Sequence, residues 1–367
     1  MGRSLQSTIS MWSGGEYSLN TQGAADAINN ATDLVLGALE RMDIDPSSRP
    51  FWVADYAAAD GGTSLQLITQ VVAAVRERAP KRPIGICYTD LPSNDYSSLF
   101  RRLHQPAPSA RSYCLEFDDI FPFASATSFY ESILPAGELD FGFSATAMHW
   151  LSEMPCELTE HFHAVGATGA ERALLKQRAA ADWERILLQR AREMRPGARF
   201  VGVNLALDDA GRHMGNTGGR NMFDEMNALW RGMVDDRRIT EAEFRRLCVP
   251  QFYRTLDEFR APFQDPQSPV YQVGLRLESA EIRYVECPYA ARFAREGDVE
   301  WFANAYVPTT RTWSESALVN SLSDTRPLAE RQALVAEFFD AFVEAVRRDP
   351  GGHGMSYVHA YLVMKKI

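Results

Sequence analysis

Two acidic residues follow short apolar runs in the first quarter of the chain, and they are the first candidates for chemistry. Asp55 ends the run that begins at Phe51, and Asp90 follows the run from Ile84 to Tyr88. In an open parallel α/β sheet, ligands bind outside the carboxyl ends of the strands. An acid after the second strand can accept hydrogen bonds from both hydroxyls of a ribose, so the spacing predicts a nucleoside site.

The residues between these acids refine that expectation. Ala57 to Gly62 forms a loop of small residues, which lets backbone amides approach a ligand closely. The chain has neither a G-x-G-x-x-G nor a G-x-x-x-x-G-K-[ST] motif, so phosphate binding is not indicated. A sulfonium nucleoside, which carries no phosphate, suits the pattern better. Ordinary strand-end and helix-capping carboxylates are the alternative interpretation of the same spacing.

Alternating helical and extended patterns must position these residues. Apolar spacing predicts helices over 24–40, 65–79, 96–103 and 170–194. Short apolar runs predict strands over 51–54, 84–88, 111–117, 139–145 and 199–205. Thr63 or Ser64 is placed to cap the helix after the first strand. This alternation is typical of an α/β fold with a largely parallel sheet covered by helices on both faces.

The pattern changes near Asp208. Helices are predicted over 221–234, 240–247 and within 299–348, and strands over 274–285 and 356–364. We therefore expect a cofactor-binding core over 1–207 and a helical cap over 208–272. A core strand within 273–298, cap and core helices over 299–354 and a C-terminal core strand over 355–367 complete the predicted organisation.

Composition excludes several classes of protein. Acidic residues outnumber basic ones by 48 to 38, for a net charge of −10, which argues against a nucleic-acid partner. With 46% hydrophobic and 23% charged residues the chain can bury a core, so global disorder is excluded. The five cysteines form no C-x-x-C pair, and His161 and His163 lack a third ligand, so we expect no disulfide scaffold and no metal.

The chain also lacks signals for a membrane. No apolar run reaches the roughly 18 residues that a membrane-spanning helix needs. The first residues contain no apolar signal region. We therefore expect no membrane association and a cytoplasmic protein.

Five sequence blocks resemble the plant SABATH family, the salicylate, benzoate and theobromine-type methyltransferases. The blocks are GEYSLNT at 15–21, VAD at 53–55, TDLPSNDY at 89–96, SFY at 128–130 and SATAMHWLSEMP at 144–155. Later pieces agree, namely Arg195-Pro196-Gly197, VPQF at 249–252, and Arg311 with Glu315. The blocks follow the family's order over essentially the whole chain.

The resemblance implies an S-adenosylmethionine-dependent methyltransferase. The implied fold is α/β, a Rossmann-like core with a mostly parallel seven-stranded sheet and a helical cap. By matching position, the cofactor's methionine end falls to Tyr17, Thr21 and Asp55, its ribose to Asp90 and Leu91, and its adenine to Ser128 and Phe129. Thr63 stands where the family usually has Asn, and Ala57 where it has Gly.

The resemblance also implies where the methyl acceptor binds. Trp150 keeps its family place, with His149 beside it, and these two are the catalytic candidates. The residues matching the family's pocket lining are Met222, Phe223, Phe252 and Trp313. The family's carboxylate-binding Gln falls at Ala24, so Gln22 is the nearby candidate to replace it.

The predicted reaction is O-methylation of a small aromatic or terpenoid carboxylic acid to its methyl ester. A carboxylate with a pKa of about 4 is ionised at pH 7, so alignment and desolvation, rather than a general base, must supply the catalysis. Methylation of a ring nitrogen, favoured by Ala24, is the first alternative. A methyltransferase-like ligand binder without activity, suggested by Ala57, is the second. The family's frequent dimers make a homodimer a further expectation.

Overall fold

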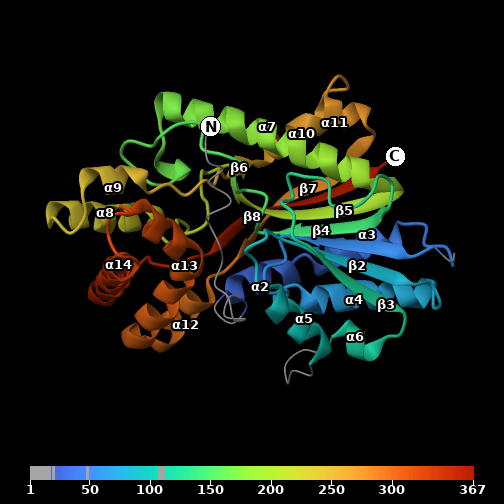
Figure 1. Cartoon of the computed structure of the whole chain (residues 1–367), viewed down its shortest axis with the longest axis horizontal. Helices are drawn as coiled ribbons and strands as arrows, with labels where there is room; N and C mark the ends of the chain where they lie inside the picture. The colour runs from blue at the N-terminus through green and yellow to red at the C-terminus, as the bar shows by residue number, and fades with distance from the viewer. Residues whose placement is uncertain (1–17, 19–20, 47–48, 106–111) are drawn as a thin grey trace.

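The computed structural model describes residue 18 and residues 21–46, 49–105 and 112–367. Its centre is one sheet with strand order β3-β2-β1-β4-β5-β8-β7 (Figure 1). The strands are β1 Phe51–Tyr56, β2 Ile84–Thr89, β3 Ile120–Ser125, β4 Leu139–Ala145, β5 Met194–Leu207, β7 Leu275–Val285 and β8 Tyr357–Lys366. A short eighth strand, β6 Arg254–Thr255, pairs with the end of β5.

Strand direction confirms the predicted, mostly parallel sheet. Neighbouring strands from β3 to β5 pair in parallel. β8 runs antiparallel to both of its neighbours, β5 and β7, so β7 is parallel to the rest. Because the parallel strands all end at one edge, the loops that follow β1, β2 and β4 lie together.

Alternating side chains of the buried strands pack on two helical layers. Val53, Val201 and Val363 face one cluster, whereas Ala54 and Phe200 face another. The first layer contains α2 Gln22–Asn29, α3 Thr32–Glu40, α4 Leu65–Arg78, α5 Tyr96–His104 and α6 Tyr113–Glu116. The opposite layer contains α7 Gly169–Glu193, α10 Leu256–Gln264 and α11 Pro269–Gln272 (Figure 1).

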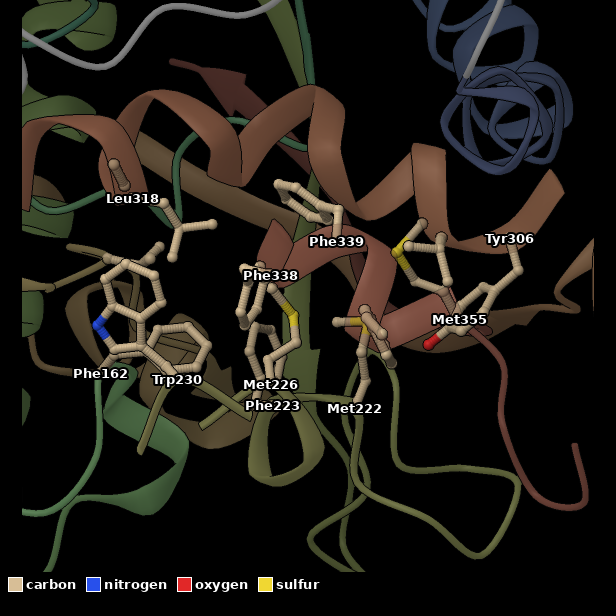
Figure 2. Packing of buried hydrophobic residues seen from close by; sticks show 14 of the residues in the cluster. Phe162, Met222, Phe223, Met226, Trp230, Tyr306, Leu318, Phe338, Phe339 and Met355 are labelled. Carbon is tan, nitrogen blue, oxygen red and sulfur yellow. The ribbon is translucent and has the colours of Figure 1, made fainter. Parts of the chain in front are cut away.

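A third group of helices lies beside the carboxyl edge of the sheet. It comprises α8 Met222–Asp235, α9 Glu241–Arg246, α12 Pro288–Glu296, α13 Val299–Ser321 and α14 Leu328–Arg348. These helices share one apolar cluster, in which the Trp230 ring meets the Phe338 ring edge-on at 5.6 Å (Figure 2). The segment 208–272 is therefore divided between two groups of helices. α8 and α9 belong to this third group, whereas Phe259 of α10 packs in the cluster against the sheet.

Two local predictions were wrong. The stretch predicted as a strand at 111–117 contains α6, because the Ser112 hydroxyl accepts the N–H of Cys114 and caps a helical turn. The strand comes later, as β3, where Ile120 pairs with Ile84 of β2. The single helix predicted over 24–40 is two helices, broken at Asn30.

No helix in the described part of the chain is both long enough and apolar enough to cross a membrane.

Candidate functional site

Asp55 is the second-last residue of β1, at the carboxyl edge of the sheet, and its exposure is only 2%. Its Oδ2 accepts a 2.6 Å hydrogen bond from the hydroxyl of Ser64. Ser64 is the N-cap residue of α4, as predicted, but its side chain makes no capping bond to the helix. The hydroxyl is instead used to hold the carboxyl group of Asp55 in place.

Burial, the largest cause, and the nearby charge of Asp90 together raise the pKa of Asp55 to about 7, although the hydrogen bond from Ser64 opposes the shift. Asp90 is fixed by backbone donors, because its two oxygens accept the N–H groups of Ala59 at 2.8 Å and Leu91 at 2.7 Å. Burial raises the pKa of Asp90 too, although these bonds oppose the shift. Neither acid has a cationic partner among the described residues, so the pair favours a cationic ligand.

The loop after β1 contains two alanines whose backbone conformation favours glycine. Ala57 has φ 64° and Ala59 has φ 50°, both in the left-handed region that β-carbons disfavour. The N–H groups of Ala57 and Ala58 donate to the Thr89 carbonyl at 2.7 and 3.0 Å, which ties the loop to β2. Ala57 therefore holds its methyl group on a strained backbone.

This loop borders a first cavity at the carboxyl end of the sheet. Its lining residues are Ala24, Ile28, Asp55, Ala57, Ala58, Ala59, Thr63, Ser64, Phe143, Ala145 and Thr146. Two predicted cofactor residues, Asp55 and Thr63, thus come together here. We call this space the cofactor cavity.

Other predicted cofactor residues are not among the lining residues of this cavity. Leu91 follows β2, and its N–H holds Asp90. Ser128 and Phe129 follow β3, where the Ser128 hydroxyl accepts the N–H of Tyr130. Tyr17 lies outside the described residues.

A second cavity adjoins the first, because Ala24 and Thr146 line both. Its lining residues are Thr21, Ala24, Thr146, His149, Trp150, Leu205, Met214, Gln251, Trp313 and Tyr357. We call this space the acceptor cavity. It brings Thr21, predicted for the cofactor, together with three residues predicted for the acceptor.

Trp150 is held in the acceptor cavity through its backbone. Its N–H donates to the Ala147 carbonyl at 3.1 Å, and its carbonyl accepts the Tyr130 hydroxyl at 2.7 Å. The backbone of Trp150 also forms an antiparallel bridge with Gln251. No acceptor for the Trp150 indole N–H occurs in the described part of the chain, so that donor is available to a ligand.

His149 is buried, with 1% exposure, and its Nδ1 has no hydrogen-bond partner within the described residues. Burial lowers the pKa of His149 well below its usual value, and the positive charges of neighbouring residues add to the shift. The imidazole is therefore neutral at physiological pH. It can form a hydrogen bond to a ligand but does not supply a positive charge.

A larger cavity of about 290 Å³ lies farther along β5. Its lining residues are Ala164, Val165, Arg172, Leu207, Gly211, His213, Asn216, Asn221, Phe252 and Tyr253. Leu207 lies two residues beyond Leu205 of the acceptor cavity, so the two side chains share one face of β5. Phe252 is thus close to the predicted acceptor site but lines this outer cavity.

Three of the predicted acceptor residues do not line these cavities. Gln22 has its amide on the exposed side of α2, where Nε2 donates to Asp26 at 2.7 Å. Met222 and Phe223 are buried in the apolar cluster of the third helical group (Figure 2). The Phe223 ring stacks on His163 at 4.0 Å, so it packs against a neighbouring buried residue and does not line any of these cavities.

Sequence reasoning missed several lining residues, above all Gln251 and Thr146. Gln251 stands within the VPQF block, but nothing in its spacing indicates where its side chain points. Thr146 has φ 52°, an unfavourable conformation for a β-branched residue, and it separates the two inner cavities. No cluster of three or more possible metal ligands occurs among the described residues.

Comparisons with known proteins agree with this geometry. The sequence profile of the SAM-dependent carboxyl methyltransferases matches residues 7–318. Methyltransferase LUC1 of Fusarium sp is 26% identical over 286 residues, covering 77% of this chain and 73% of that protein. Indole-3-acetate O-methyltransferase 1 of Arabidopsis thaliana is 24% identical, covering 66% and 68% respectively.

A solved structure shows the same fold. Loganic acid methyltransferase with SAH superposes with a TM-score of 0.75 at 18% identity, over 97% of this chain and 98% of that one. The profile match spans most of the sequence. The chain therefore belongs to the S-adenosylmethionine-dependent carboxyl methyltransferase family.

Proposed function

We propose that this methyltransferase converts a small aromatic or terpenoid carboxylic acid to its methyl ester. The family supplies the reaction class, methyl transfer from S-adenosylmethionine to a carboxyl group. The observation that carries the proposal is that the cofactor cavity and the acceptor cavity adjoin each other. Thr21, a proposed cofactor residue, lines the same small space as Trp150, the proposed hydrogen-bond donor to the carboxylate. A methyl donor and an acceptor oxygen can meet there.

The residues present suit the cofactor. S-adenosylmethionine carries two positive charges, on its sulfonium and its ammonium groups, and supplies an electrophilic methyl group. The buried carboxyl of Asp55, with Thr21 and Tyr17, would hold its methionine end. Asp90 would accept the ribose hydroxyls, with Leu91 beside it. The adenine would lie near Ser128 and Phe129, and Thr63 would line the cofactor cavity.

The acceptor side is organised to align and desolvate a carboxylate. The indole N–H of Trp150 would donate to one carboxylate oxygen, and neutral His149 would border or hydrogen-bond the same group. The apolar wall formed by Leu205, Met214 and Trp313 would exclude water from the nucleophile. Correct alignment of two reactants can contribute about 7–11 kcal/mol, so no general base is required.

The body of the acid would extend toward the outer cavity. That cavity offers the Phe252 ring beside polar groups such as Asn216 and Asn221. We propose that the third helical group serves as the cap that shapes this end of the site. The relatives' names include indole-3-acetate and loganic acid, which are an aromatic and a terpenoid acid.

Transfer of labelled methyl from S-adenosylmethionine to a panel of acids and nitrogen heterocycles tests the proposal. The panel contains indole-3-acetate, loganic acid, benzoate and xanthines, and each product is identified. Base-labile label on an acid is the expected result. Label on a ring nitrogen would replace the proposal by N-methylation, and no transfer to any acceptor would contradict it.

A further inference from the structure

We propose that Gln251 binds the carboxylate of the acceptor together with Trp150, and so replaces the glutamine that the family places where this chain has Ala24. This assignment rests on the proposed function. It requires that the Gln251 side chain reach the acceptor cavity beside Trp150, that its amide present N–H groups there, and that these donors be unused. The structure meets each requirement.

The first requirement follows from the backbone. Trp150 and Gln251 are directly opposite each other in an antiparallel bridge. Bonds on both sides fix this register, because Leu151 N–H donates to Pro250 at 2.7 Å and Phe252 N–H donates to His149 at 2.9 Å. Directly opposed residues place their side chains on the same side of an antiparallel pair, with β-carbons about 5 Å apart. Both side chains line the acceptor cavity.

The orientation of the Gln251 amide is fixed by two donors. Its Oε1 lies 3.2 Å from Nε2 of His163 and accepts the Tyr253 hydroxyl at 2.9 Å. The backbone N–H of Val165 donates to Nδ1 of His163 at 3.2 Å, so Nδ1 carries a lone pair. The neutral imidazole therefore has its proton on Nε2 and donates it to Gln251. The amide oxygen faces these donors, and its NH₂ group must point away from them.

The imidazole that sets this orientation is itself well held. His163 is fully buried, which lowers its pKa well below the usual value and keeps it neutral. Phe223 stacks on its ring at 4.0 Å with an interplanar angle of 17°. Phe223 and His163 are thus positioning residues, which act on the acceptor through Gln251.

The donors of Gln251 are unused. No hydrogen-bond partner for Nε2 occurs in the described ranges, although the residue is only 2% exposed. Because Gln251 lines the acceptor cavity, its N–H₂ group is available there to a ligand that accepts hydrogen bonds. With the Trp150 indole N–H alongside, the cavity offers donors to both oxygens of a carboxylate. Because Ala24 borders the same cavity, its small side chain leaves room for this arrangement.

The test compares KM for each acid of the panel in the wild type, Gln251→Ala and Gln251→Glu. A lost hydrogen bond to a charged group predicts that Gln251→Ala raises KM roughly 10- to 100-fold. Its affinity for S-adenosylhomocysteine, measured by calorimetry, should stay within about twofold of the wild type. Gln177→Ala, which removes an exposed amide on α7, is the matched control and should leave KM unchanged.

Gln251→Glu separates binding from structure, because it keeps an acceptor for His163 and Tyr253. Its ionised carboxylate should repel the acid and raise KM more than Gln251→Ala does. Protonation at lower pH restores a donor, so the KM of Gln251→Glu should fall with falling pH, whereas a purely structural role predicts no such profile.

The outcomes distinguish the two proposals. If the wild type forms esters and Gln251→Ala keeps its KM, the assignment of Gln251 is overturned while the proposed function stands. Equal losses of acid and S-adenosylhomocysteine affinity would also overturn the assignment. If calorimetry detects no acid binding to the wild type saturated with S-adenosylhomocysteine, the proposed function and this assignment both fail.

Discussion

At the scale of single residues, the proposed cofactor site contains a carboxyl group that is costly to ionise. Burial raises the pKa of Asp55 to about 7, so the free site holds a proton below that pH. A cationic ligand requires the ionised form, and binding must therefore release the proton when the solution is acidic. The affinity for the cofactor should therefore fall as the pH falls.

We predict that the Kd for S-adenosylmethionine rises about tenfold between pH 8 and pH 6, because the ionised fraction of Asp55 falls by about that factor. Calorimetry in two buffers of different ionisation enthalpy would also detect the proton that is released. Asp55→Asn should bind more weakly and lose most of the pH dependence. A wild-type Kd that is the same at both pH values would contradict this account.

Backbone strain at Ala57 gives a second prediction at this scale. A left-handed conformation costs a non-glycine residue about 1–2 kcal/mol, which exceeds the extra chain entropy that glycine loses on folding. Ala57→Gly should therefore stabilise the protein by about 0.5–1 kcal/mol in urea denaturation. Ala58 has an ordinary φ, so Ala58→Gly should destabilise by a similar amount. A loss of stability in Ala57→Gly would show that its methyl contacts outweigh the strain.

At the scale of elements, the sequence predicted most of the strands, though not β3 or β6, and the edge of the sheet at which Asp55 and Asp90 lie. The apolar runs that end near Asp55 and Asp90 specify buried strands, and the rules for parallel sheets then place both acids together. The sequence did not predict which face of α8 points to the site. Apolar residues at helical spacing mark a buried face, but Phe223 could pack on the acceptor or behind it. Its actual place depends on α13 and α14.

The position of α8 makes Phe223 a structural residue. Its ring is fully buried and contacts His163 and Trp313. Phe223→Ala should cost about 3–5 kcal/mol of unfolding free energy, the usual range for removing a buried aromatic ring. Urea denaturation would measure it, with Leu174→Ala on the exposed face of α7 as a control expected within about 0.5 kcal/mol. A cost as small as that of the control would mean that Phe223 does not support the cluster.

At the scale of the whole molecule, the site unites distant parts of the chain. The acceptor cavity alone is lined by residues from Thr21 near the beginning to Tyr357 on the last strand, with Gln251 between them. Sequence motifs predict the cofactor half, because its proposed residues follow strands. The acceptor half depends on how a bridge, a loop and the third helical group meet, and that packing cannot be deduced from local spacing.

A ligand that binds such a site must stabilise the entire fold. At 100 times its Kd, S-adenosylhomocysteine should add about 2.7 kcal/mol to the unfolding free energy. For a chain of this size we expect the Tm to rise by about 2–6 °C. Asp90→Ala should lose most of this increase, because it removes the proposed ribose acceptors. Trp150→Ala should retain it, since that residue lines the acceptor cavity and not the cofactor cavity. Scanning calorimetry of the three proteins decides the matter: an unchanged Tm in the wild type would refute cofactor binding at this edge of the sheet.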